Sequence, residues 1–213
     1  MHTPFQATTL AALLALALAP SSTVLAADSG EQAQETKARL DAARGESAKI
    51  RNQVGITLEE LNRLQKASVE LRPQLGKFGA ELAKMEEQAR VARDRVLAMG
   101  NKGKAYFQAW EDQINSIANA EIRDQAQKRY NKRVQSYNKI IKAMTAARDE
   151  LIPFMSDLND TKKLLDSELS RESVKSAKNT IKSANRHGED VVKSLQEVES
   201  ELDRVSAELA KYK

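Results

Sequence analysis

The chain has 213 residues, of which 30% are charged and 41% hydrophobic, whereas aromatic residues make up only 4%. Eight glycines and so few aromatic side chains argue against a compact α/β enzyme, and the composition is typical of helical bundles and coiled coils. The absence of cysteine excludes disulfides and cysteine-ligated zinc sites, and the formal net charge is +4.

The first 26 residues have the pattern of an export signal that is cleaved after Ala26. Residues 10–20 form an apolar run too short to span a bilayer, and small residues follow it before Ala26. No Lys or Arg precedes Lys37, so the usual basic start of a signal peptide is missing, and an apolar start to the first helix is the alternative. After cleavage, we expect residues 27–213 to form one domain without a transmembrane segment, in the bacterial periplasm or secreted.

A heptad pattern of apolar residues predicts a long helix from residue 31 to about residue 99. Alternate steps of three and four residues carry one stripe from Leu40 through Leu61 and beyond, and this is the period of helices packed side by side. Pro73 conflicts with a regular helix because proline removes a backbone hydrogen bond. Since the hydrophobic phase is the same on both sides of Pro73, we expect a continuous helix that bends there rather than two helices.

The rest of the chain is punctuated by turn and cap residues. Residues 100–103, Gly-Asn-Lys-Gly, predict a turn, and a short helical connector is expected over residues 104–118. Asn119 is suited to cap the next helix, which Pro153 is expected to kink, and Ser170 is suited to cap the last helix. The turns are short, so the expected fold is all-α, an elongated antiparallel helical bundle or coiled coil of about three long helices.

Residue types that carry catalysis or bind metals are scarce. After cleavage the chain has one histidine, His187, which argues against histidine-rich metal sites and Ser–His–Asp catalysis. The sequence His-Gly-Glu-Asp at residues 187–190 is expected to be a local weak spot or a solvated cluster in the last helix. No glycine-rich phosphate loop is present, and the carboxylates follow helix-surface spacing. We therefore expect no enzymatic activity, no metal and no cofactor.

The densest aromatic group is formed by Tyr106, Phe107 and Trp110. Tyr106 and Trp110 are four residues apart, so they share one face of a helix. The expected role of this group is the core of one end of the bundle, and a ligand pocket is the alternative.

The strongest charge pattern is a stretch at residues 125–148 with seven basic residues and no acidic residue. Several of its lysines follow helical spacing on a face away from the apolar stripe. This face is either simply solvated or a docking site for an anionic partner. For an exported protein, the partner would be phospholipid headgroups, lipopolysaccharide, a cell-wall polymer or an acidic protein, and not nucleic acid. The candidate binding residues are Lys128, Arg129, Lys132, Arg133, Lys139 and Lys142.

Two segments, AYFQAWE at residues 105–111 and PFMSDLND at residues 153–160, resemble characteristic stretches of the bacterial domain of unknown function 2959 family. The order of the predicted helices agrees with that family over roughly residues 33–210. The resemblance implies an all-helical, coiled-coil-like exported protein, and it supplies no activity, cofactor or catalytic residue.

The predicted function is that of a non-enzymatic interaction or scaffold protein of the cell envelope, which binds protein partners through helix surfaces. The alternative is a module that docks on an anionic envelope polymer or membrane surface through the basic helix at residues 125–148. Heptad stripes serve a monomeric bundle and a homo-oligomer equally well, so both states stay open.

Overall fold

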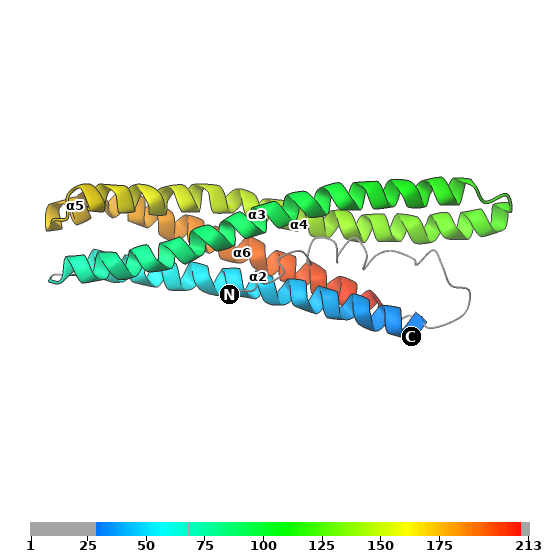
Figure 1. Ribbon diagram of the computed structural model, residues 1–213, viewed down its shortest axis with the longest axis horizontal. Helices are drawn as coiled ribbons and strands as arrows, with labels where there is room; N and C mark the ends of the chain where they lie inside the picture. The colour runs from blue at the N-terminus through cyan, green and yellow to red at the C-terminus, as the bar shows by residue number, and fades with distance from the viewer. Residues whose placement is uncertain (1–28, 68, 210–213) are drawn as a thin grey trace, which may run out of the picture. The chain divides into compact units, whose positions relative to one another are not determined.

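The computed structural model describes residues 29–67 and 69–209, and every regular element in these ranges is a helix (Figure 1). The helices are α2 (Ser29–Lys66), α3 (Leu71–Asn115), α4 (Ala120–Ser167), α5 (Arg171–Ser176) and α6 (Lys178–Leu209). The predicted all-α fold is thereby confirmed. The predicted export signal at residues 1–26 lies outside the described residues.

Within the described residues four helices are long, with 38, 45, 48 and 32 residues, whereas the sequence predicted three. The extra helix arises because the continuous helix predicted through Pro73 is wrong. Helix α2 ends at Lys66, the chain reverses, and Glu70 adopts a positive φ of 59° just before α3 begins at Leu71. Pro73 therefore lies in the first turn of α3, where the backbone N–H that it lacks has no intrahelical acceptor.

The turn predicted at residues 100–103 is also wrong, because α3 continues through these residues to Asn115. The predicted connector at residues 104–118 is mostly the last part of α3. Gly103 is buried, and a Cβ atom built there would lie 1.9 Å from Tyr137 Oη. This glycine therefore makes room for a side chain of another helix instead of turning the chain.

Both predicted caps are confirmed. The Asn119 side-chain oxygen accepts a hydrogen bond of 3.1 Å from the backbone N–H of Ile122, at the start of α4. Ser170 Oγ accepts one of 3.1 Å from the backbone N–H of Ser173, although the helix that it caps is the short α5 that precedes α6. Pro153 lies inside α4, and the helix runs through it to Ser167.

The chain divides into two compact units, and each unit combines several stretches of sequence. Within the described residues, unit 1 holds 29–45, 94–143 and 199–209, and unit 2 holds 46–67, 69–93 and 144–198. The single domain predicted for residues 27–213 stays a prediction.

In unit 2, α2 and α3 run antiparallel and are joined by polar contacts. Gln53 Nε2 on α2 donates to the Glu81 carboxylate on α3 at 2.9 Å, and Gln74 Nε2 on α3 donates to the Glu60 carboxylate on α2 at 2.7 Å. As residue numbers rise along α2, those of the partners on α3 fall, which establishes the antiparallel direction.

Helix α6 packs against both α2 and α4 within unit 2. The side-chain amides of Asn62 on α2 and Asn185 on α6 exchange two hydrogen bonds, of 2.8 and 3.0 Å. Three residues later, a Cβ atom at Gly188 would lie 2.6 Å from Leu58 Cδ1 and 3.1 Å from Phe154 Cε2. The glycine therefore allows a close approach of α6 to side chains of two neighbouring helices.

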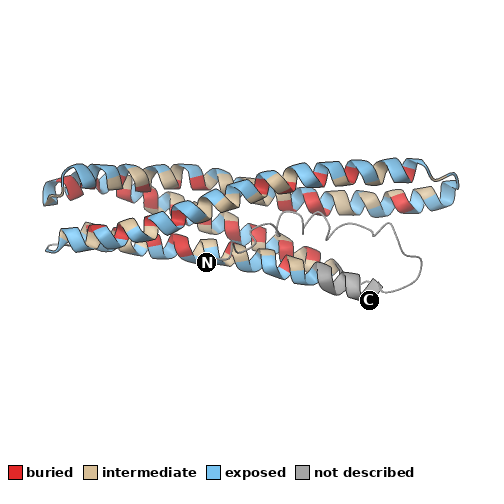
Figure 2. Ribbon diagram, in the orientation of Figure 1, coloured by how far each residue is buried: buried red, intermediate tan, exposed pale blue. Residues whose placement is uncertain are grey.

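Buried residues recur along one side of each long helix, as the heptad stripes predicted (Figure 2). Burial of such side chains contributes about 25 cal/mol per Å² of apolar area and is the main stabilising term for thin helical cores. The largest side chains that are fully buried in unit 2 are Leu61, Leu64, Phe78, Met85, Phe154, Leu158, Leu165 and Ile181.

Candidate functional site

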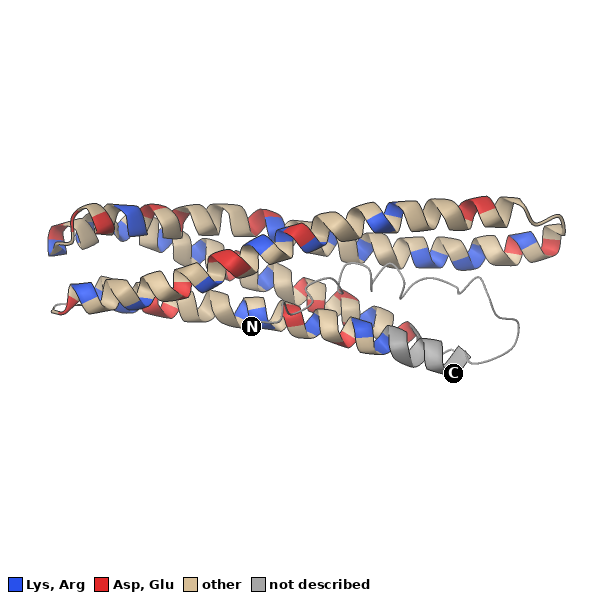
Figure 3. Ribbon diagram, in the orientation of Figure 1, with Lys and Arg blue, Asp and Glu red and all other residues tan. Residues whose placement is uncertain are grey.

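The candidate basic residues lie on the first half of α4, in unit 1, where Figure 3 shows basic residues recurring along the helix. Lys128, Lys132, Lys139 and Lys142 are all exposed. Their spacings of four, seven and three residues place them on one face of a helix with 3.6 residues per turn. None of the four forms an ion pair with a carboxylate of the described residues, so their charges face solvent. We call these four residues the lysine face.

The two candidate arginines do not belong to the lysine face. Arg129 is exposed, but its position in the helical repeat lies between the lysine face and the buried side of α4. Arg133 is half-buried and lies close enough to Tyr106 to influence its ionisation. The structure therefore brings together four of the six predicted residues and separates the other two from them.

The lysine face lacks ion pairs because the local sequence offers almost no acid. Elsewhere, Arg90 pairs with Glu87 at 2.7 Å and Lys162 with Asp166 at 2.5 Å, the i,i+3 and i,i+4 contacts typical of helix surfaces. No acid occurs between residues 125 and 148, so Lys132, Lys139 and Lys142 have no such local partner, and Asp124, four residues before Lys128, forms no ion pair with it. Residues 94–143 of unit 1 include ten basic and five acidic residues.

The aromatic group predicted at residues 106–110 packs against two tyrosines of α4 in unit 1. The ring centroids of Phe107 and Tyr137 are 5.1 Å apart, and those of Trp110 and Tyr130 are 5.4 Å apart. Phe107 and Tyr137 are each only 6% exposed. The predicted core role is therefore confirmed for Phe107, and the aromatic contacts fix how α3 and α4 pair here. The sequence prediction of this group did not include the two tyrosines.

The tyrosine hydroxyls of this cluster are held protonated. Tyr137 Oη donates a hydrogen bond of 2.7 Å to the backbone carbonyl of Met99, and Tyr106 Oη is buried without a partner among the described residues. Burial raises the pKa of both hydroxyls. The pKa of Tyr106 lies well above the usual range, although the nearby charge of Arg133 opposes the increase. Burial and the nearby Glu111 raise the pKa of Tyr130 too. These hydroxyls are therefore unsuited to act as bases near neutral pH.

The His-Gly-Glu-Asp segment at residues 187–190 is a packing element. His187 Nδ1 lies 2.9 Å from Asp157 Oδ2, and both side chains are 21% exposed. Gly188 is buried against α2 and α4, whereas Glu189 is exposed, and the predicted weak spot stays a prediction. Over the part of the chain that the structure describes, no three His, Asp or Glu side chains gather in a way that could hold a metal ion. Nor does any described helix have the length and apolarity needed to cross a membrane.

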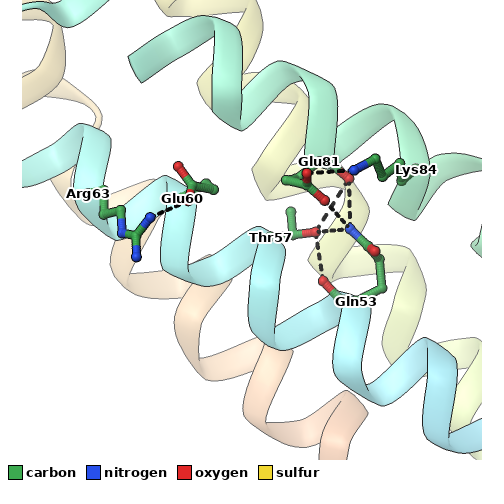
Figure 4. A network of polar contacts seen from close by, with 6 residues as sticks. All are labelled: Gln53, Thr57, Glu60, Arg63, Glu81 and Lys84. Carbon is green, nitrogen blue, oxygen red and sulfur yellow. Dashed lines mark hydrogen bonds and ion pairs between the residues drawn. The ribbon is translucent and has the colours of Figure 1, made fainter. Parts of the chain in front are cut away.

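A polar network that sequence reasoning missed joins α2 to α3 in unit 2 (Figure 4). Gln53 is 7% exposed and Thr57 is fully buried, and both direct hydrogen bonds toward Glu81. The Glu81 carboxylate also accepts a bond of 2.7 Å from Lys84. The hydrogen bonds from Lys84 and, secondly, Gln53 lower the pKa of Glu81. Because a displaced helix would deprive Gln53 and Thr57 of their contacts with Glu81, the network favours one register of the α2–α3 pair.

The Glu81 network predicts a specific pH dependence of stability. Because the folded-state pKa of Glu81 is lowered, its contribution is present above the unfolded-state pKa and is lost as the pH falls through the folded value. Wild type should therefore lose more stability than Glu81→Gln between about pH 7 and pH 3, since a glutamine has no charge to lose. Urea unfolding followed by circular dichroism at several pH values measures this difference. Parallel pH curves for the two proteins would contradict it.

One of three comparisons with known proteins found a match. The model of the family described as "Protein of unknown function (DUF2959)" matches residues 30–209, which includes nearly all of the described residues. The comparisons with curated proteins and with solved structures gave no match. The two segments that carried the resemblance lie within this match, at residues 105–111 on α3 and 153–160 on α4.

Proposed function

The chain belongs to the DUF2959 family of proteins of unknown function, and from this premise we propose that it is a non-enzymatic interaction or scaffold protein of the cell envelope. It is exported by the signal at residues 1–26 and works in the periplasm or outside the cell. Its long helices form a coiled-coil-like bundle that presents helix surfaces to protein partners.

The observation that carries this proposal is the lysine face of α4. Four exposed cations without ion pairs to described carboxylates remain free to bind a partner of opposite charge. Some polar groups elsewhere are committed to packing between helices, as in the pairs Asp157–His187 and Asn62–Asn185. A partner with an acidic surface gains most from the lysine face, and electrostatic attraction also speeds its association.

A crosslinking experiment in living cells tests the proposal. A photo-reactive amino acid replaces Lys132 in the lysine face, and in a matched control it replaces Lys182, an exposed lysine of α6 in unit 2. The proposal expects a discrete protein adduct in the envelope fraction for position 132 and none for position 182. Recovery of the protein from the cytosol with its signal intact would contradict the proposal. So would turnover of a defined substrate that a single substitution abolishes.

The second candidate function is docking of the basic helix on an anionic envelope polymer or membrane surface. It is favoured by the run from residue 125 to residue 148, in which basic side chains occur without any acid. In this function the partner is a repetitive polyanion, so binding would be strongly salt-dependent and tolerant of the exact position of each charge.

A further inference from the structure

We propose that the lysine face, together with the amide side chains beside it, binds an anionic glycan polymer rather than a lipid bilayer. This inference rests on the second candidate function and chooses between the two partners that it left open. The amide residues are Asn131, Gln135 and Asn138, all exposed.

The charges of the lysine face are arranged for a linear partner. The first and last of them, Lys128 and Lys142, are fourteen residues apart in one uninterrupted helix. At about 1.5 Å per residue, they span roughly 21 Å along the helix axis. Glu121 and Asp124 precede this segment on α4, so the cationic surface ends near the start of the helix. A polymer with an anion on each repeating unit can meet several of these lysines at once.

The amides add chemistry that suits sugar hydroxyls. Asn131, Gln135 and Asn138 fall at helical positions next to the lysines, and each amide carries a donor and an acceptor. Asn131 Oδ1 accepts a bond of 3.1 Å from Gln127 Nε2, which leaves the Asn131 NH₂ group free to donate outward. Hydroxyl groups also donate and accept, so a polyhydroxylated polymer uses both functions of these side chains.

A bilayer fits this surface less well because the surface has no apolar side chain to insert. Helices that lie in a membrane interface pair a basic face with exposed Trp, Phe or Leu residues. Between residues 125 and 148, no large hydrophobic side chain of α4 is exposed, and Ile140 is completely buried. Attraction to headgroups would therefore rest on charge alone, whereas a glycan also gains the amide hydrogen bonds.

The test compares binding of the purified mature chain to a soluble polyuronate, to neutral dextran and to phosphatidylglycerol vesicles over a salt series. We expect the chain to bind the polyuronate. Its affinity for dextran and for the vesicles should be at least tenfold weaker. Lys132→Glu/Lys139→Glu should weaken polyuronate binding at least tenfold. Gln135→Ala/Asn138→Ala should weaken it several-fold with an unchanged salt dependence, because it removes hydrogen bonds and no charge.

Charge reversal at Lys178 and Lys182, two exposed lysines in unit 2, is the matched control and should leave binding unchanged. Circular dichroism verifies that each variant is folded.

Vesicle binding that equals polyuronate binding and is lost in Lys132→Glu/Lys139→Glu would overturn the glycan inference while supporting the second candidate function. Binding to neither probe would overturn both, and a crosslink from position 132 to a protein would then leave the scaffold function standing. Light scattering that shows salt-sensitive self-association lost in Lys132→Glu/Lys139→Glu would assign the face to a second copy and overturn the inference.

Discussion

Replacing Gly103 with alanine is expected to destabilise the chain by roughly 3 kcal/mol, because the new methyl group has no space. A Cβ atom at this position would lie 1.9 Å from Tyr137 Oη and 2.1 Å from Cζ of the same ring. The ring is rigid, buried in the aromatic cluster and tied to the Met99 carbonyl by a hydrogen bond of 2.7 Å. Relief of the clash therefore requires Tyr137 to leave its site or α3 and α4 to separate.

Gly100→Ala is the matched control for Gly103→Ala. Gly100 lies three residues earlier in the same helix, and a Cβ atom there would meet no other atom within 4 Å. Alanine is favoured over glycine in a helix interior by about 1 kcal/mol, so this variant should be stabilised. Denaturant unfolding followed by circular dichroism gives both free energies of unfolding. Two changes of the same sign would contradict the packing role of Gly103.

The same pair of glycines shows why local sequence misassigned this region. Glycines three residues apart with Asn and Lys between them are a common turn signal, and helix propensity alone disfavours both positions. Gly103 instead leaves space for a side chain that lies 34 residues further along the chain, Tyr137, which occupies the position that a Cβ atom would take. Local sequence does not reveal such a tertiary requirement, because glycine serves both to form a turn and to make room for a ring of another helix.

Pro73 misled the prediction in the opposite sense. The hydrophobic phase continues across it, which indicated one helix, but the end of α2 and the start of α3 bury their stripes in the same unit. Leu64 before the reversal and Leu75 after it are both buried. The chain reversal keeps both apolar faces toward a common core. Its length happens to preserve the heptad phase across Pro73. The positive φ of Glu70 could not be read from the sequence, since non-glycine residues rarely adopt it.

The candidate site was predicted better than the chain reversals. Helical spacing identified the lysines that share a face, because exposure of a long polar side chain follows directly from its angle to the apolar stripe. The same rule sets Arg133 apart from the lysines, since five residues from Lys128 correspond to about 140° around the helix, and Arg133 is accordingly half-buried. The Gln53–Glu81 contact was missed because the two residues lie 28 positions apart on different helices, and local spacing does not indicate which helices pair.

At one position of α4 the buried residue lies next to the one that heptad spacing indicates, and this has an energetic consequence at Phe154. Steps of four and three residues from Leu151 to Leu158 pass through Met155, yet Met155 is only partly buried and Phe154 is fully buried. Phe154 also lies where a Cβ atom at Gly188 would be 3.1 Å from its ring. The ring thus fills the space that the glycine of α6 leaves open, and the two positions depend on each other.

Phe154→Ala is accordingly expected to cost about 3–5 kcal/mol of unfolding free energy, because it removes a buried ring and leaves a cavity. Ile152→Ala is the control: Ile152 is two residues away on the same helix, also flanks Pro153, and is 66% exposed, so its truncation should change stability by less than about 0.5 kcal/mol. Thermal and urea unfolding of both variants measure the contrast. A large loss for Ile152→Ala with a small one for Phe154→Ala would mean that the opposite face of α4 is buried. In that event the close approach of α6 at Gly188 would need another explanation.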